Sequence, residues 1–497
     1  MKNQAFNPFL PSYEYIPDGE PYIFNNRVHV YGSHDRFDGT GFCMNDYVCW
    51  SAPVDDLSNW RYDGVIYRKG QDPQDPDGTR SMYAPDIMQG ADGRYYLFYA
   101  LDMGGVMSVA VCDEPTGDFQ FYGHVRRGDG SIIGTSPDDI FQFDPGVFMD
   151  DDGRVFLYSG FSPRNHEKFI ERKLRVDGCY VMELEPDMLT VKYEPKLVLT
   201  GAGAKCEHFP GYAGHEYFEA PSIRKINRRY YLAYSSINFH ELCYAVSDKP
   251  DEGFEYGGTI VSIGDVFLNG RTGKNALNYL GNTHGGMINI HGQWYIFYHR
   301  HTNFHDFSRQ MCAEPICFGE DGRIQQVEVT SCGLNGGALS GIGEYEARIA
   351  CNLTYRGGSS THRPNKSAAG DNPYFTQNRA DAEPGEYAES YQYIANMRDG
   401  AMAGFKYFQY EGAGTINVRV RGNAYGKMVV STAPDGVPLA EIRIKPSENF
   451  EPFYASLCPW QGVSGLYFIF AGEGWLDFLS FKLDVQRSGE HCLPHNT

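Results

Sequence analysis

The sequence lacks the features of several large classes of protein. No stretch approaches 18 consecutive apolar residues, so no segment is long enough to cross a membrane as a helix. Basic residues are few: 43 Lys and Arg stand against 63 Asp and Glu. The resulting formal charge of −20 argues against binding to nucleic acid or to an anionic membrane surface. The first residues, Met1–Pro8, contain no apolar core of a secretory signal, which predicts a cytoplasmic protein.

Cysteine pairs and helical patterns are also missing. The twelve cysteines form no Cys-x-x-Cys pair and no zinc-finger spacing, and most of them lie inside strand-like runs. We therefore expect buried free thiols rather than disulfides. No amphipathic helix of any length is evident. Abundant aromatic residues (36 Tyr and 32 Phe) and 57 glycines instead favour many short strands joined by tight turns.

One aromatic strand phrase occurs five times along the chain. Its copies are Arg27–Tyr31 (RVHVY), Arg94–Phe98 (RYYLF), Arg154–Tyr158 (RVFLY), Arg229–Ala233 (RYYLA) and Gln293–Phe297 (QWYIF). The copies start 67, 60, 75 and 64 residues apart, and each follows a hairpin turn sequence. Units of this size are typical of a radial repeat in which each unit is one sheet. The sequence predicts an all-β chain whose residues 1–333 form a five-bladed β-propeller.

After residue 333 the blade pattern stops. Residues 334–372 include a polar stretch rich in Gly, Ser and Pro, which predicts a connecting linker. Beyond it, runs such as Thr415–Arg421 and Leu466–Phe470 are typical of short strands. We predict that residues 373–497 form a smaller, jelly-roll-like β-sandwich.

The repeat carries one ionisable group per blade. Each stands eight to ten residues before the aromatic phrase: Asp18, Asp86, Asp144, Glu219 and His284. At that position each group would lie on the innermost strand and face the propeller axis. Four carboxyl groups in one small volume raise one another's pKa, which is costly for a purely structural arrangement. Hydrolysis of a neutral sugar bond requires such a cluster, so the pattern predicts a glycosidase site.

Each of these residues also has an ordinary structural interpretation. Asp18 lies in Pro-Asp-Gly, a common turn sequence, and Asp144 precedes a proline. For Asp18, Asp144 and Glu219 the repeated phase favours catalysis. For Asp86 a structural hydrogen bond is an equal alternative to substrate contact, and His284 is equally explained as a core histidine. The histidines after His284 form no metal-ligand pattern on a helix, which argues against a catalytic zinc.

Several motifs together resemble glycoside hydrolase family 43, a family of five-bladed propeller enzymes. They are Pro17-Asp18-Gly19, Tyr83-Ala-Pro-Asp86, Phe143-Asp-Pro-Gly-Val-Phe148, Glu219-Ala-Pro221, His284-Gly-Gly286 and Ser308-Arg309. The resemblance implies that Asp18 is the general base, Glu219 the general acid, and Asp144 the carboxylate that orients and tunes the acid. It also implies that Arg309 contacts the sugar at the non-reducing end.

The same resemblance bears on cofactors and on the sugar platform. It implies no required cofactor, and it places His284 near the axis, where a structural Ca²⁺ or other small ion is held through water. His284 is therefore our predicted metal ligand as well as a substrate-binding residue. Phe37, like Phe42 and Phe161, falls in a loop after an inner strand and is predicted either to support a sugar ring or to pack in the core. The end of the second domain, Leu466–Phe478, resembles carbohydrate-binding module family 6.

These expectations lead to a functional hypothesis with open alternatives. We expect an inverting, exo-acting hydrolase that releases α-L-arabinofuranose from arabinoxylan- or arabinan-derived oligosaccharides. A β-D-xylosidase acting on xylo-oligosaccharides is the main alternative. A non-catalytic sugar-binding propeller would be expected to lose the acid or the base, and both are present. The retaining five-bladed fructosidases carry Asn-Asp-Pro and Arg-Asp-Pro motifs that this sequence lacks.

Overall fold

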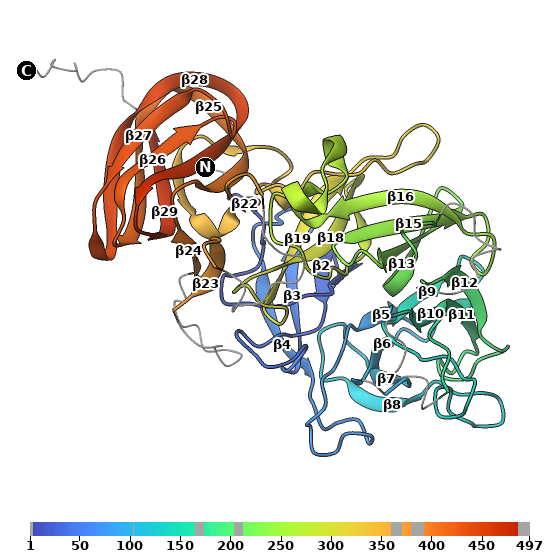
Figure 1. The fold of residues 1–497 in the computed structure, drawn as a ribbon. Helices are drawn as coiled ribbons and strands as arrows, with labels where there is room; N and C mark the ends of the chain where they lie inside the picture. The colour runs from blue at the N-terminus through green and yellow to red at the C-terminus, as the bar shows by residue number, and fades with distance from the viewer. Residues whose placement is uncertain are drawn as a thin grey trace, which may run out of the picture.

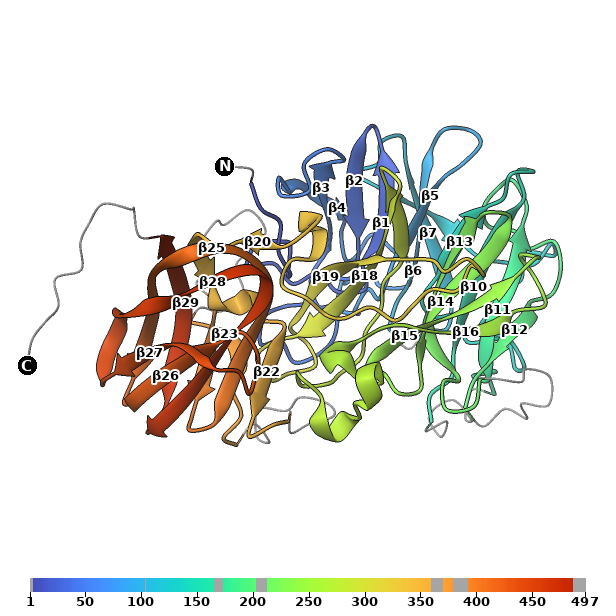
Figure 2. The ribbon, with the colours of Figure 1, turned by 90° about the horizontal axis from the view of Figure 1, so that it is seen from above.

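The computed structural model describes residues 3–102, 104–164, 173–202, 212–358, 370–378 and 392–485. In Figures 1 and 2 the chain forms two β domains that lie side by side, one coloured blue to yellow and the other orange to red. The described helices are short 3-10 turns at Ile263–Asp265, Leu268–Gly270, Gly273–Asn275, Gly333–Asn335 and Ala347–Ile349. None of the described helices has the length and apolarity needed to span a bilayer.

The first domain is a propeller of five antiparallel sheets with their strands in chain order. The first blade comprises β1 (Glu20–Phe24), β2 (Arg27–Tyr31), β3 (Tyr47–Pro53) and β4 (Arg61–Tyr67). The second comprises β5 (Asp86–Gln89), β6 (Tyr95–Ala100), β7 (Met107–Cys112) and β8 (Gln120–His124). The third comprises β9 (Gly146–Met149), β10 (Val155–Phe161), β11 (Gly178–Leu184) and β12 (Lys196–Thr200). The fourth comprises β13 (Tyr217–Ile226), β14 (Arg229–Ser236), β15 (Glu241–Ser247) and β16 (Glu255–Ser262). The fifth has three strands, β17 (Met287–Ile290), β18 (Gln293–His301) and β19 (Arg309–Ile316).

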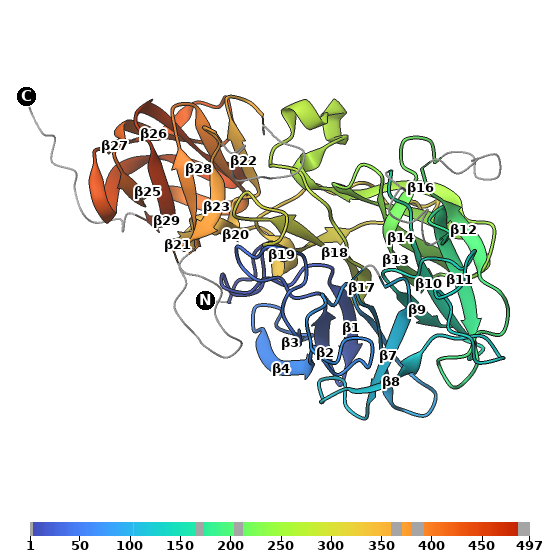
Figure 3. The ribbon, with the colours of Figure 1, turned by 60° about the horizontal axis from the view of Figure 1, so that its bottom comes forward.

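The aromatic phrase lies in the second strand of every blade, and the predicted five-bladed propeller is confirmed. In the first blade the preceding hairpin turn is Asn25-Asn26, and both residues have positive φ, 49° and 59°, as a tight two-residue turn requires. The second strands are buried on both faces because each blade packs between two others. Figure 3 shows the first blade beside β17 and β18 of the last one, where Gly19 and Gly285 form a parallel bridge. Val28 and Val30 share a core with Phe297 there, which closes the ring.

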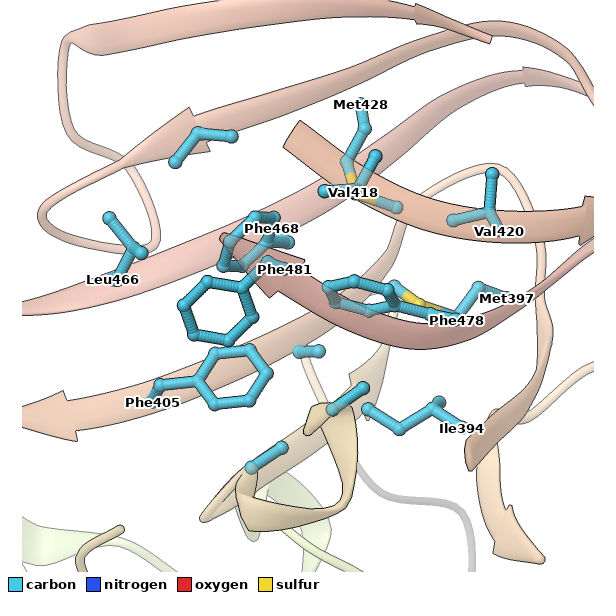
Figure 4. Packing of buried hydrophobic residues seen from close by; sticks show 14 of the residues in the cluster. Ile394, Met397, Phe405, Val418, Val420, Met428, Leu466, Phe468, Phe478 and Phe481 are labelled. Atoms are coloured by element: carbon cyan, nitrogen blue, oxygen red, sulfur yellow. The ribbon is translucent and has the colours of Figure 1, made fainter. Parts of the chain in front are cut away.

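The second domain is one strongly curled sheet with a sandwich-like shape. Its strands are β20 (Leu339–Ser340), β21 (Gly343–Glu346), β22 (Asn352–Tyr355), β23 (Tyr374–Gln377), β24 (Gln392–Met397), β25 (Ala401–Gly422), β26 (Tyr425–Ser431), β27 (Pro438–Ile444), β28 (Ser447–Glu473) and β29 (Leu476–Val485). The long strands β25 and β28 pair with register shifts, which let the sheet bend around its core. Figure 4 shows that core, in which Phe405 and Phe468 lie 4.8 and 4.9 Å from the ring of Phe481.

The expected linker differs from the structure. Residues 334–372 contain β20, β21 and β22, which pair with β25 and β29 of the second domain. These strands are two to four residues long, too short for a clear alternating pattern, and so the sequence did not reveal them. The polar residues 359–369 lie outside the described residues.

The two domains share one hydrophobic core. The cluster that fills the second domain also contains Tyr279 and Phe304 of the propeller. Buried Lys406 of β25 adds ion pairs to the propeller residues Asp265, at 3.1 Å, and Glu328, at 2.8 Å. The second domain is therefore packed firmly against the part of the propeller that contains the fifth blade.

Candidate active site

Four of the five predicted axial residues line one cavity. Asp18, Asp144, Glu219 and His284 surround a volume of about 270 Å³, together with Arg309. Each stands at or just before the innermost strand of its blade, as the repeat predicted. The convergence of these side chains from four blades forms the candidate site.

Unusual backbone conformations aim the carboxyl groups at the cavity. Asp18, Asp144 and Ala220 have φ values of 59°, 47° and 68°, in the left-handed region that costs energy for residues other than glycine. Glu219 lies between two register shifts in the pairing of β13 with β14. Such bulges re-aim side chains near functional sites. The ring of blades therefore holds strained conformations where the carboxyl groups converge.

Asp18 lies among hydrogen-bond donors on one side of the cavity. Its Oδ1 accepts a hydrogen bond from Arg309 Nη1 at 3.0 Å, and its Oδ2 accepts one from Ser33 Oγ at 2.6 Å. Its backbone N–H donates to His299 Nδ1 at 3.2 Å, so this nitrogen is an acceptor and the ring proton is on Nε2. Burial and the nearby Arg309 hold the pKa of His299 well below its usual value. Asp18 is only 4% exposed, and this set of donors fixes both of its oxygens.

Arg309 connects Asp18 to a second buried carboxylate, Asp35. Its Nε and Nη2 donate to the two oxygens of Asp35 at 2.8 and 2.9 Å, a bidentate pair. The ring of Phe42 lies 4.9 Å from the guanidinium. Burial alone would lower the pKa of Arg309, but the two carboxylates raise it well above its ordinary value. Arg309 is thus a fixed cation, 2% exposed, at the wall of the cavity.

Asp144 lies in a different environment. Burial raises its pKa well above the usual range, and the neighbouring Glu219 and Asp18 carboxyls raise it further. His284 Nδ1 lies 3.7 Å from Asp144 Oδ2 and 3.9 Å from Asp18 Oδ1. Burial lowers the pKa of His284, which favours a neutral imidazole. Asp144 is therefore protonated more readily than an ordinary aspartate.

Aromatic rings form the wall on the side of Asp144 and Glu219. Successive ring centroids are separated by 5.1 Å for Tyr83–Phe143, 4.9 Å for Phe143–Phe161, 5.3 Å for Phe161–Phe218 and 4.7 Å for Phe218–Phe239. All five rings line the cavity. They offer apolar faces to a sugar ring and keep the local dielectric low, which strengthens electrostatic interactions.

Asp86 and Phe37 are not among the residues that line this cavity, and their contacts favour the structural alternative for each. Asp86 Oδ1 accepts from Tyr22 Oη at 2.6 Å, and its Oδ2 accepts from the backbone N–H of Val147 at 2.7 Å, so it ties three blades together. Burial and the neighbouring Glu20 raise the pKa of Asp86 to about 8. Phe37 is buried with its ring 5.3 Å from that of Tyr15. Among the phenylalanines proposed as a platform, Phe42 and Phe161 do line the cavity.

Several residues of the cavity were not anticipated from the sequence. They include Phe141, Phe143, Phe218, Phe239, Tyr83, Asn282 and Asp306. One usable signal is that Phe143 and Phe218 directly precede the carboxyl residues of their blades. Asn282 stands two residues before His284. Its Oδ1 lies 2.9 Å from His301 Nε2. Asp35 had no such signal because its partner Arg309 is 274 residues away.

The predicted metal ligand His284 does not belong to a ready-made cluster. Within the described ranges, the one group of three metal-ligating side chains is His215, Glu241 and Cys243 in the fourth blade. Hydrogen bonds explain that group, because Glu241 Oε1 lies 2.7 Å from His215 Nδ1 and also accepts from Ser236 Oγ at 2.5 Å. The pKa of Glu241 falls to about 2, since these bonds outweigh the effect of burial.

Among the residues that the structure describes, His284 Nε2 and Glu20 Oε1 are buried polar atoms without a hydrogen-bond partner. An imidazole nitrogen and a carboxylate oxygen fit a hydrated cation such as Ca²⁺, which prefers oxygen ligands and retains water. His284 and Glu20 would hold such an ion through its water molecules. Its role would be structural, since it would satisfy these two unpaired atoms while Glu20 Oε2 remains paired with Arg224 Nη2 at 2.8 Å.

Buried carboxyl groups beside an aromatic wall on a propeller axis are features that a glycoside hydrolase requires. The family model for glycosyl hydrolases family 43 matches residues 14–324. The chain belongs to glycosyl hydrolase family 43, whose reaction needs no cofactor. It is 49% identical over 488 residues to a xylosidase/arabinosidase of Thermoclostridium stercorarium, and the match covers 97% of this chain and 99% of that one.

Two further comparisons extend over both domains. An arabinoxylan arabinofuranohydrolase of Bacillus subtilis is 24% identical over 496 residues, which are 92% of this chain and 88% of that one. The crystal structure of a family 43 arabinoxylan arabinofuranohydrolase from Bacillus subtilis, in complex with cellotetraose, covers 97% of each chain with a TM-score of 0.51 and 20% identity. This structural likeness supports the two-domain fold.

Proposed function

We propose that this enzyme is an inverting, exo-acting hydrolase that releases α-L-arabinofuranose from oligosaccharides derived from arabinoxylan or arabinan. The observation that carries the proposal is the contrast around the cavity. Asp18 is held by a cation and a hydroxyl group, whereas Glu219 stands beside an aromatic wall and the buried Asp144, whose pKa is raised by burial and by the carboxyls of Glu219 and Asp18. Different environments for two carboxyl groups are how one site supplies both a base and an acid.

In the proposed reaction Asp18 is the general base. Its Oδ atoms are oriented by Arg309 and Ser33, so that it takes a proton from a water molecule as that water attacks the anomeric carbon. The water oxygen forms a bond to the anomeric carbon on the face opposite the leaving group. The configuration of the released sugar is therefore inverted.

Glu219 is the general acid of the same step. It gives its proton to the glycosidic oxygen as the bond from that oxygen to the anomeric carbon breaks. Asp144, buried beside it, keeps negative charge from accumulating on both carboxyls and orients the acid. The proton taken by Asp18 and the proton lost by Glu219 balance, and solvent restores both residues after the products leave.

The cavity also supports an exo mode of action. Its volume of about 270 Å³ is just below the usual range of small-molecule sites, which starts near about 300 Å³. A space of this size suits one terminal pentose rather than the interior of a chain. The aromatic wall would contact the ring, and Arg309 would donate to its hydroxyl groups.

The choice of sugar rests on the relatives. The printed name of the Thermoclostridium stercorarium relative covers xylosidase and arabinosidase activity, and that relative spans nearly the whole chain. The Bacillus subtilis relative, which spans both domains as well, is named for arabinofuranose release. These names support α-L-arabinofuranose first and β-D-xylose as the second candidate.

A direct comparison of two aryl glycosides tests the proposal. Purified enzyme is assayed on an aryl α-L-arabinofuranoside and on the matching aryl β-D-xyloside, with the Asp18→Asn variant as a control for contaminating activity. We expect the larger kcat/KM on the arabinofuranoside, and free arabinose as the only small product from arabino-oligosaccharides. A larger kcat/KM on the xyloside would assign the enzyme to xylose, and release of internal oligosaccharides would refute the exo mode.

A further inference from the structure

The loop between β18 and β19, residues 302–308, reaches from the second domain to the active site. It brings Asp306 to the cavity wall and leads directly into Arg309, which binds Asp18. We propose that strand β23 of the second domain is a positioning element for the catalytic base, acting through Thr376 and Gln377. This inference rests on the proposed function, in which Asp18 is that base.

The first connection runs through Asn303 of this loop. Thr376 Oγ1 donates to Asn303 Oδ1 at 2.9 Å, and the backbone N–H of Asn303 donates to the carbonyl of Phe375 at 2.5 Å. Asn303 Nδ2 in turn donates to Asp38 Oδ1 at 2.9 Å. Strand β23 therefore contacts, through one buried amide, both the β18–β19 loop and the loop that follows β2.

The backbone of the loop requires outside support. Asn303 and Phe304 both have positive φ, 56° and 47°, a conformation that costs energy and persists only where surrounding contacts fix it. Phe304 is buried in the shared core, with its ring 5.1 Å from Tyr279 and 6.2 Å from Tyr374 of β23. The second domain supplies much of this support.

A parallel contact fixes the strand that precedes the loop. The guanidinium of Arg300, in β18, lies 4.0 Å from the ring centroid of Phe375 in β23. It also donates to the carbonyl groups of Ala350, at 2.8 Å, and Arg348, at 2.5 Å. Arg300, near the end of β18, thus binds at the domain interface, whereas Arg309, the first residue of β19, lines the cavity.

The second connection runs through Tyr15 near the N-terminus. Tyr15 Oη donates to Gln377 Oε1 at 2.7 Å, and Gln392 Nε2 donates to Tyr15 Oη at 3.3 Å. The carbonyl of Tyr15 accepts the backbone N–H of Asp35 at 2.9 Å. Asp35 then holds Arg309 in the bidentate ion pair described above.

Both connections converge on the same guanidinium. One sets the loop from which Arg309 emerges, and the other sets the carboxylate that fixes its far side. Arg309 Nη1 is one of the two side-chain donors that orient Asp18. Because a small misplacement of a catalytic group lowers turnover strongly, loosening β23 lowers the rate without removing any group from the cavity.

Two conservative variants test this positioning role. Thr376→Val removes the hydroxyl that binds Asn303, and Tyr15→Phe removes the hydroxyl that binds Gln377. Thr376→Val loses one hydrogen bond, and Tyr15→Phe loses the short bond to Gln377 together with the longer one from Gln392. A hydrogen bond is worth about 1 kcal/mol, so we expect kcat on the better aryl glycoside to fall at least about fivefold in each variant with KM nearly unchanged. Because both connections converge on Arg309, we expect the two substitutions to be coupled, so that the double variant loses less than the roughly 25-fold product of two fivefold effects.

Matched controls separate positioning from general stability. Thr376→Ser keeps the hydroxyl and should retain nearly wild-type kcat. Thr415→Val makes the same change at an exposed position of β25 and should change nothing. Thermal unfolding is followed for every variant, and kinetics are measured well below the lowest midpoint. If Thr376→Val does not fold, Tyr15→Phe alone decides the matter.

The outcomes are distinct. Wild-type kcat in Tyr15→Phe and Thr376→Val, or a change in KM alone, would overturn the positioning role, even if the unfolding temperature fell. An effect of Thr415→Val equal to that of Thr376→Val would overturn it as well. Failure of the proposed function looks different, because the wild-type enzyme itself would then hydrolyse neither aryl glycoside.

Discussion

The two sides of the cavity treat their carboxyl groups in opposite ways. Asp18 is surrounded by donors, with Arg309 and Ser33 bound to its oxygens and His299 neutral beside it. Asp144 is buried beside the carboxyl groups of Glu219 and Asp18, and burial and these neighbours raise its pKa well above the usual range. One side supplies hydrogen-bond donors to its carboxyl group, and the other raises the pKa of its carboxyl group. Reactions that need an acid and a base at one pH are built on such a difference.

The comparison also explains the distribution of residue types. The donor side comes from residues far apart in sequence, because a buried ion pair such as Arg309–Asp35 forms only when distant loops meet. The aromatic side consists of residues that neighbour the carboxyls, such as Phe143 and Phe218. The donor side therefore depends on the correct closure of the ring and on the second domain, while the aromatic side is largely built into the blades.

Asp18→Asn should lower kcat more than any other substitution proposed here, because it removes the general base and replaces one carboxylate oxygen by an NH2 group. General base catalysis is worth about 10²–10⁴-fold, and we expect a loss of that size in kcat. The loss should be equal on natural oligosaccharides and on aryl glycosides, since both need an activated water. A loss confined to natural substrates would instead assign Asp18 to the leaving-group side.

Glu219→Gln should show a loss that depends on the leaving group. On natural oligosaccharides the expected loss is again about 10²–10⁴-fold, because the departing alcohol needs a proton. On aryl glycosides with acidic phenols the loss should be much smaller. Steady-state kinetics on both kinds of substrate make the comparison, and equal losses would show that Glu219 has a structural role.

Ser33→Ala sharpens the description of the donor side. It removes the 2.6 Å hydrogen bond to Asp18 Oδ2. A hydrogen bond to a charged group is worth about 1.5–3 kcal/mol, so kcat/KM should fall roughly ten- to a hundredfold. Ser58→Ala, in the loop between β3 and β4, is a matched control that should leave kcat/KM unchanged. Wild-type kinetics in Ser33→Ala would show that the hydroxyl does not orient the base.

Asp86→Asn should affect stability rather than catalysis. The pKa of Asp86 in the folded protein is about 8, above its ordinary value of about 4, so the folded state binds the proton more tightly. The stabilisation is complete below the unfolded pKa and is lost as the pH rises through 8. Between pH 7 and 9 wild-type stability should fall by about 1 kcal/mol more than that of Asp86→Asn.

Denaturant unfolding at the two pH values measures this difference, with exposed Asp118→Asn as the control. The same pH dependence in wild type and Asp86→Asn would show that Asp86 does not titrate in this range. A large loss of kcat in Asp86→Asn would return it to the active site, contrary to its position outside the cavity.

The sequence predicted the parts of this fold that are local and repeated. The aromatic phrase marked the second strand of each blade, and the residues before it located Asp18, Asp144, Glu219 and His284. The position of Asp86 outside the cavity lining has a geometric cause. It stands eight residues before its phrase, whereas the other carboxyls stand nine or ten before theirs, and it is the first residue of β5 itself. Its side chain consequently bonds to neighbouring blades instead of lining the cavity.

Contacts between distant residues were beyond the reach of these patterns. Nothing in the sequence around Asp35 or Thr376 indicates a link to the fifth blade, because such links depend on how loops and domains pack. The strands β20, β21 and β22 were missed for a related reason, since each is stabilised by the long strands β25 and β29 rather than by its own pattern.

The stereochemistry of hydrolysis tests the central claim most directly. If Asp18 activates water while Glu219 protonates the leaving group, the sugar is released with inverted anomeric configuration. Proton NMR of the first turnovers, recorded before mutarotation, shows which anomer forms. We predict the β anomer of arabinofuranose from an α-L-arabinofuranoside, or the α anomer of xylose from a β-D-xyloside. Initial retention would mean that a carboxylate attacks the sugar itself, and it would contradict the roles assigned to both sides of the cavity.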